Sequence, residues 1–322
     1  MLLKSLDHVF WLGRYLERLD DTARLINATS HVLIDSHQDT QFGWPILLEV
    51  LGQDSAALLQ KFQQGDTPLT LAETERAVMA CLINAPDSPV SIRATCAALK
   101  QNARTLRPLI PRDMWEELNA LDLFLQQHCS TAVSRQQRYQ LMAEVSRRCQ
   151  MVVGVLDGTM LRGDAFDVFN IGRHLERADM TTRIMDVLVL QQLQPTQIKR
   201  PKFRWLSVLN ALGGMESYQY YLAHQKGDVD AIDYLLTYAD FPRSISYCLN
   251  RVAASAKTLP HAGAILAQLQ QVQALLKPQA LSELSTVQLH SLIDELQAGI
   301  IGLHQQILEP CLQPVAVVQL SA

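Results

Sequence analysis

The sequence predicts an all-α protein, built as a tandem pseudo-repeat of two related multi-helix, bundle-like halves. Leu, Ala and Gln are abundant, and glycine and proline fall at breaks between helical segments. No convincing stretch shows the alternation of apolar and polar residues that is typical of strands. The segment Phe10 to Arg24 returns 159 positions later as Phe169 to Arg183, with nine of fifteen positions identical. Such a self-match indicates a duplicated structural unit.

Periodicity and helix-ending residues divide the first half into six expected helices. The first has unbroken helical periodicity from about Leu6 to the mid-thirties, and a polar break follows before Trp44. Pro45 suits a first helical turn, and the later breaks contain proline or glycine, which end helices. The helices expected after the first run over residues 44–63, 71–84, 91–107, 113–127 and 135–156.

The second half carries landmarks in the same order as the first. Trp44 corresponds to Trp205, and the Pro89-Val90-Ser91 segment corresponds to Pro242-Arg243-Ser244. We therefore divide the chain into halves 1–160 and 161–322, which we expect to form one compact unit. Two C-terminal helices are expected over 262–276 and 285–308, and residues 191–202 are the most linker-like segment. The tail after Pro310 is apolar and suits packing on the body or on a second copy in a homodimer.

Composition narrows the range of functions. The formal net charge is −4 with no block of like charge, which argues against nucleic acid as the main partner. Six cysteines are scattered without ligand-like spacing and are interpreted as reduced core residues of a cytoplasmic protein. No apolar run approaches the roughly 20 residues of a membrane span, so we expect no membrane partner.

The repeated motif has the common core G-R-x-L-E-R-x-D-x-T-x-R. At 100° per residue, one side of each motif helix is apolar, while three arginines and two carboxylates share an arc of about 160° on the other. Each charged face therefore needs a partner, a ligand or water. The faces carry Arg14, Glu17, Arg18, Asp20 and Arg24 in the first copy, and Arg173, Glu176, Arg177, Asp179 and Arg183 in the second.

Three interpretations of these charges stay open. They form a structural network that locks the two repeats together, a pocket for an anion or a carboxylate substrate, or a docking face. Arginine clusters bind planar carboxylate and phosphate groups through paired hydrogen bonds. Glu17 and Glu176 are the candidate catalytic residues, since either acts as an acid or base if its pKa is raised. Further candidates for binding are Arg162, before the second motif helix, and Arg243 and Ser244 at an expected helix N-terminus, where anions bind.

Several chemistries are set aside by the absence of their motifs. The sequence has no H-E-x-x-H, no E-x-x-H pair, no G-x-S-x-G and no Walker loop. Nine histidines are dispersed, so we expect no metal site and no cofactor of the chain's own.

The long motifs G-R-Y-L-E-R-L-D-D-T-A-R and I-G-R-H-L-E-R-A-D-M-T-T-R, with T-M-L-R and F-P-R-S-I, resemble the bacterial alpha-E family over essentially the whole chain. That family is a predicted all-helical domain with a conserved E-R motif. Its members typically occur beside, or fused to, a circularly permuted ATP-grasp ligase, often with a transglutaminase-like protein. Asp21 has Met180 as its counterpart and is the weakest residue to carry over.

The resemblance implies an accessory or co-catalytic partner of such a ligase in the formation or modification of peptide or amide bonds. The chain then offers an arginine- and glutamate-lined cleft, and any ATP is bound by the ligase. Two alternatives stay open. One is a stand-alone enzyme that uses Glu17 or Glu176 with an arginine clamp, and the other is a helical scaffold whose buried salt bridges are purely structural.

Overall fold

The computed structural model describes residues 3–35, 43–63, 67–130, 134–192, 201–224, 230–259, 262–276, 281 and 284–312. Every regular element in these ranges is helical, so the predicted all-α class is confirmed. No helix within them is long and apolar enough to cross a membrane. The expected linker (residues 191–202) and the apolar C-terminal tail lie largely outside the described residues.

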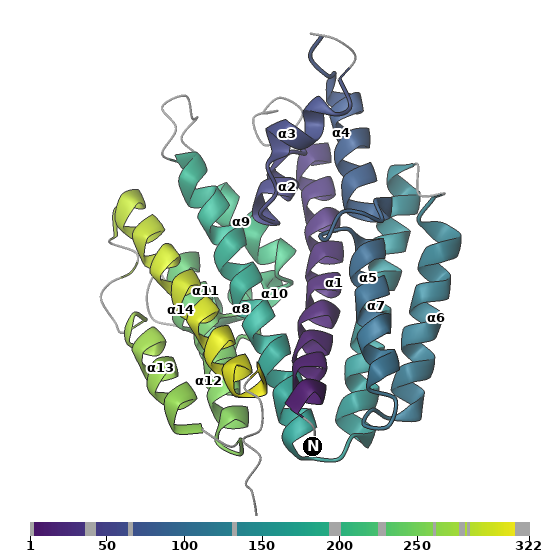
Figure 1. Ribbon diagram of the computed structural model, residues 1–322. Helices are drawn as coiled ribbons and strands as arrows, with labels where there is room; N and C mark the ends of the chain where they lie inside the picture. Colours follow the sequence, from purple (N-terminus) through teal and green to yellow (C-terminus); the bar gives the residue numbers. More distant parts are fainter. Residues whose placement is uncertain are drawn as a thin grey trace, which may run out of the picture.

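Two long helices form the centre of the molecule. They are α1 (Leu3–Asp35) and α8 (Asp164–Gln192), and each contains one copy of the repeated motif. Both begin at the lower end of the molecule in Figure 1 and run upward side by side. Their mutual contact is the most extensive between any two elements. The apolar face predicted for the motif is buried, as Leu12, Leu16, Leu19 and Ala23 illustrate.

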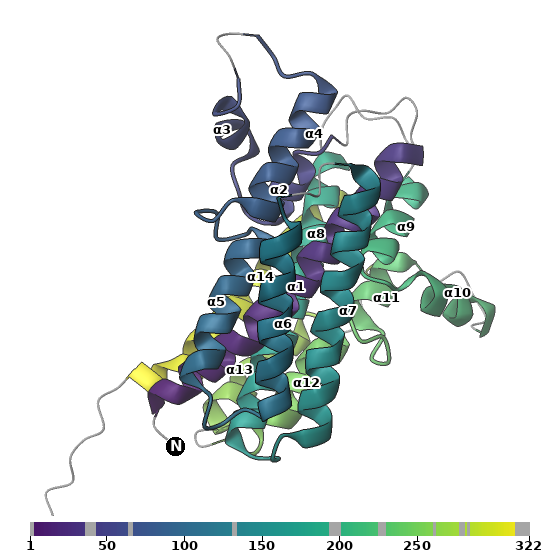
Figure 2. The ribbon, with the colours of Figure 1, turned by 90° about the vertical axis from the view of Figure 1, so that its right-hand side faces the viewer.

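Each central helix belongs to a group of four. Helix α1 packs on α5 and α7, and α6 contacts both of these; α8 packs on α12 and α14, and α13 contacts both of these. Figures 1 and 2 show the two groups lying on either side of the α1–α8 contact. The flanking helices are α5 (Ile92–Thr105), α6 (Arg112–His128), α7 (Arg135–Thr159), α12 (Ile245–Ala256), α13 (Ala262–Ala274) and α14 (Thr286–Leu312).

Shorter helices lie at the top and at mid-height of the molecule in Figure 1. Thr70 and Glu73 form a capping box at the start of α4, and the last turn before residue 85 is a π-helix. Asp230 caps α11 by accepting a hydrogen bond from the backbone N–H of Ile232. These elements are α2 (Ile46–Val50), α3 (Ser55–Gln60), α4 (Leu71–Met79), the π-turn η1 (Ala80–Asn84), α9 (Pro201–Ala211), α10 (Met215–His224) and α11 (Ala231–Thr237).

The single helix expected over residues 44–63 was wrong, because the chain forms α2 and α3 instead. The break lies at Gly52, whose φ of 72° is in the left-handed region that glycine adopts without strain. Asp54 then starts α3 by accepting a hydrogen bond from the N–H of Ala57 at 3.0 Å. Gly213, with a φ of 62°, makes the corresponding break between α9 and α10.

Candidate functional site

The two motif helices approach most closely at a pair of glycines. A Cβ atom added to Gly13 on α1 collides with the carbonyl oxygen of Phe169 on α8, and one added to Gly172 collides with the carbonyl oxygen of Phe10. The glycine that begins each G-R-x-L-E-R motif therefore allows the two backbones to come into direct contact. This close approach fixes which charged side chains meet across the interface.

Each glutamate of the motif is paired with arginines of the opposite helix. Glu176 accepts hydrogen bonds from Arg14, at 2.5 Å to Nε, and from Arg18, at 3.1 Å to Nη2. Glu17 accepts two from Arg177, at 2.6 Å to Nε and 2.9 Å to Nη2. Arg173 also lies close to Glu17, with Nε 3.3 Å from Oε2, but this contact lacks hydrogen-bond geometry.

The motif aspartates bind the last arginine of their own helix. Asp20 accepts from Arg24 at 2.9 Å, and Asp179 pairs with Arg183 at 3.1 Å, both with i,i+4 spacing. The guanidinium groups then extend across the interface. Arg24 Nη1 lies over Gly213 and Arg183 Nη1 lies over Gly52, so a side chain at either glycine crowds the arginine of the other half.

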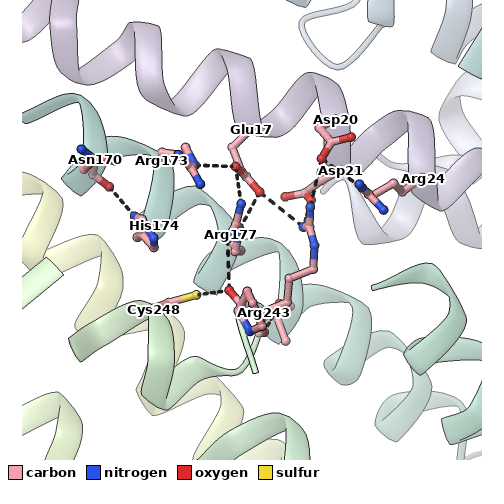
Figure 3. Close-up of polar contacts among 12 residues, drawn as sticks. Glu17, Asp20, Asp21, Arg24, Asn170, Arg173, His174, Arg177, Arg243 and Cys248 are labelled. Atoms are coloured by element: carbon pink, nitrogen blue, oxygen red, sulfur yellow. Dashed lines mark hydrogen bonds and ion pairs between the residues drawn. The ribbon is translucent and has the colours of Figure 1, made fainter. Parts of the chain in front are cut away.

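Arg243 brings a third arginine to Glu17. Its Nη1 lies 3.4 Å from Glu17 and also pairs with Asp21, and its Nη2 donates to Asp20 at 3.0 Å. The turn that carries Arg243 is held on α8, since Arg177 donates to the carbonyl of Pro242 and Thr181 donates to that of Arg243 itself. Figure 3 shows Arg243 reaching from this turn toward the carboxylates of α1.

Two other candidates lie outside this network. Ser244 is buried and caps α12, with its hydroxyl accepting from the N–H of Tyr247 and donating to the carbonyl of Tyr238. Arg162 bonds the backbone carbonyls of Asp157 and Met160 and stacks over Phe166. Both side chains therefore make local structural contacts, while the other eleven candidate site residues meet between α1 and α8.

The network is deeply buried. The side chains of Glu17 and Glu176 are each 3% exposed. Burial acts to raise the pKa of Glu17, but the charges of Arg177 and Arg243 outweigh it and hold this pKa well below its usual range. The pKa of Glu176 is lowered in the same way by Arg14 and Arg18. Both glutamates are therefore ionised, and their negative charges are balanced by arginines of the protein itself.

Asp21 behaves in the opposite way. Burial, opposed by Arg243 and reinforced by the charges of Glu17 and Asp20, raises its pKa to about 7. Its Oδ2 atom has no hydrogen-bond partner among the described residues. Asp21 is therefore the carboxyl group of this network that binds a proton near neutral pH, although sequence comparison of the two repeats gave it the least weight.

The raised pKa of Asp21 predicts a specific pH dependence of stability. An aspartate in the unfolded chain titrates near 3.9, so between about pH 4 and 7 the folded protein binds more protons than the unfolded one. The contribution of Asp21 to the free energy of unfolding then falls as pH rises through this window. We expect Asp21→Asn, which keeps the neutral form, to gain stability relative to the wild type between pH 5 and 8. Urea unfolding of both proteins at the two pH values measures the difference. If their free energies of unfolding change in parallel with pH, the raised pKa of Asp21 is contradicted.

Several contributors to the site were not among the candidates from the sequence, including Gly13, Gly172 and His304. Gly13 and Gly172 were part of the quoted motif, but their role depends on the crossing of two helices. His304 on α14 lies 3.3 Å from Arg14 Nη1 and edge-on to the ring of Phe10. No local pattern marks a histidine 290 positions from its partner. Five cysteines are buried and free, as expected for core residues: Cys81, Cys96, Cys129, Cys149 and Cys248.

The similarity to known proteins covers most of the chain and is not confined to the motifs. Among curated proteins, uncharacterised proteins of Mycobacterium bovis and Mycobacterium tuberculosis are 24% identical to the chain over 320 residues. The match covers 92% of this chain but 35% of each relative, so the chain spans about a third of their length. No solved structure matches the chain. The model of the Alpha-E family, described as a predicted alpha-helical domain with a conserved ER motif, matches residues 1–310. The chain therefore belongs to the Alpha-E family.

Proposed function

We propose that the chain is a non-catalytic helical partner of a circularly permuted ATP-grasp ligase that forms or modifies peptide or amide bonds. The observation that favours a non-catalytic role is the pairing of both motif glutamates with arginines of the opposite helix. A general base needs an accessible lone pair and a pKa near the working pH. Glu17 and Glu176 are buried and their pKa values are lowered, which gives the stand-alone enzyme less support.

The same pairing favours a structural role for the charged network. Arg14, Arg18 and Arg177 already bind carboxylates of the protein, so an external anion has to displace Glu17 or Glu176 to reach them. Surfaces outside the network then contact the ligase. This supports the scaffold interpretation of the charges within the partner function.

The arrangement of the helices supports a duplication of one unit, with halves 1–160 and 161–322. The contacts of α1 with α5 and α7 correspond to those of α8 with α12 and α14, and the α1–α9 contact corresponds to that of α8 with α2. The reciprocal pairs of glycine, glutamate and arginine support it further. Glu17 and Glu176 each neutralise arginines of the other half, so the two halves depend on each other.

The length of the relatives supports a function that depends on a second protein. In the mycobacterial relatives the matching region is about a third of a longer chain, so there it is joined to further parts of the same protein. The family resemblance names the neighbour as the ATP-grasp ligase, with a transglutaminase-like protein as a second partner. We place the complex in the cytoplasm, and the ligase rather than this chain binds ATP.

Association with the ligase is the test of this proposal. We expect the chain to co-elute with the circularly permuted ATP-grasp protein of the same genome in size-exclusion chromatography, and to change the rate at which that protein converts ATP to ADP. An ATP-grasp ligase of unrelated specificity serves as the control. If neither co-elution nor a rate change occurs, the partner function is wrong. ATP-independent turnover by the chain alone supports the stand-alone enzyme instead.

A further inference from the structure

A second cluster of ionisable side chains joins α8 to α14, outside the E-R network. His290 on α14 lies between two carboxylates. Its Nδ1 is 2.6 Å from Oδ1 of Asp186 on α8, and its Nε2 is 3.6 Å from Oδ2 of Asp294, one turn later on α14. One ligand atom from each of the three residues lies within 4.8 Å of the others.

We propose that His290 and Asp294 bind a divalent transition-metal ion such as Zn²⁺, with Asp186 orienting the imidazole. The distance of 3.6 Å between Nε2 and Asp294 is too long for a good hydrogen bond. Two ligands of one tetrahedral ion, each about 2.1 Å from it, lie roughly 3.4 Å apart. The observed spacing therefore suits two ligands of a shared ion better than a direct contact.

Asp186 prepares the imidazole for this role. Because a carboxylate only accepts hydrogen bonds, the short contact at Nδ1 places the proton on that nitrogen and leaves the Nε2 lone pair free. A histidine that ligates a metal almost always donates its other N–H to a carboxylate, a backbone carbonyl or water. The side chain of Asp186 is 15% exposed, so it is held firmly against the ring.

The surroundings suit a cation that comes from solvent. Asp294 is 58% exposed and His290 is 29% exposed, so the two ligands are accessible. Arg183, one turn before Asp186 on α8, is itself paired with Asp179. The imidazole ligand favours zinc, copper, iron or nickel over magnesium. Two protein ligands leave the remaining coordination positions to water, which describes an open site on α14 whose histidine is held on α8 by Asp186.

The sequence predicts no metal site because its histidines are dispersed and no motif places metal ligands at close spacing along the chain. Here the orienting carboxylate lies 104 positions before the histidine. Only the packing of α14 on α8 brings them together. The remaining signal, a histidine and an aspartate four residues apart, is common on solvated helix faces.

Isothermal titration of the chelator-treated chain with ZnCl₂ tests the site, with MgCl₂ as the reference cation. We expect Zn²⁺ to bind with a component that is lost in His290→Gln and in Asp294→Asn, and weakened about 10–100-fold in Asp186→Asn, as for other orienting partners. His224→Gln is the matched control, since His224 is an exposed histidine whose Nδ1 contacts the carbonyl of Tyr220 in its own helix.

The difference in Zn²⁺ binding between wild type and these variants distinguishes this site from any cysteine that binds zinc elsewhere. The proposal is overturned if wild type binds Zn²⁺ no better than Mg²⁺, or if His290→Gln titrates like wild type. Circular dichroism of each variant verifies that the helical fold is retained. In either negative outcome, His290 is a plain ion-pair partner of the two aspartates.

Discussion

Replacing Gly172 with alanine is expected to destabilise the protein by about 3 kcal/mol, at the upper end of the usual cost of overpacking. The added Cβ meets the backbone carbonyl of Phe10, and a backbone atom cannot move aside by changing rotamer. Helices α1 and α8 must separate, which also lengthens the Arg–Glu pairs on either side of the crossing. Gly13→Ala is expected to act in the same way through Phe169.

The chain offers a matched control for this prediction. Gly154 is also inside a helix, α7, but has no atom within 4 Å of an added Cβ. Alanine is favoured over glycine in an exposed helix by about 1 kcal/mol, so Gly154→Ala is expected to raise the thermal midpoint while Gly172→Ala lowers it by several degrees. Differential scanning calorimetry measures both. Equal shifts for the two variants mean that the glycine crossing does not determine the α1–α8 contact.

The E-R motif illustrates how far sequence reasoning extends. Helical periodicity correctly separates the apolar face of α1, with Leu12 and Leu16 buried, from the charged face. The sequence of a single helix does not determine which arginine pairs with which carboxylate of the other helix, however. The pairing of Glu17 with Arg177 and of Glu176 with Arg14 depends on the crossing angle and register of two helices about 160 positions apart.

The errors have equally local causes. The break between α2 and α3 depends on one residue, Gly52, and a single glycine inside an apolar periodic segment is also tolerated within helices. Arg243 was a candidate because it lies at an expected helix N-terminus, where anions bind. Its actual partners, the carboxylates of α1 more than 220 positions away, follow from tertiary packing alone.

Glu17→Gln is expected to cost about 3–5 kcal/mol of unfolding free energy, the range found when one partner of a buried ion pair is removed. The substitution leaves the guanidinium group of Arg177 buried without the charge that balances it, and removes one of the three carboxylates around Arg243. Chemical denaturation of wild type and variant measures the effect. Glu116→Gln is the control, because its pair with Arg112 is exposed on α6 and such pairs contribute about 0–1 kcal/mol.

A stability of Glu17→Gln equal to or above that of wild type contradicts the structural role. The charges are then retained at the expense of stability, as residues of functional sites are. A search for a carboxylate or phosphate ligand between α1 and α8 is the next step in that case.

Apolar residues occupy the sequence positions that correspond to part of this network, one in each half of the chain. Met180 and Val90 occupy the positions that correspond to Asp21 and Arg243, and both are buried. Arg243→Val alone leaves Asp21 buried beside Glu17 and Asp20 without its cation, whereas Asp21→Met with Arg243→Val introduces the residues found at the corresponding positions, Met180 and Val90. Replacing a complete buried ion pair with apolar residues is often neutral or stabilising. We therefore expect the double variant to be more stable than Arg243→Val, which shows that the balance of charge, rather than any single residue, determines the stability of the network.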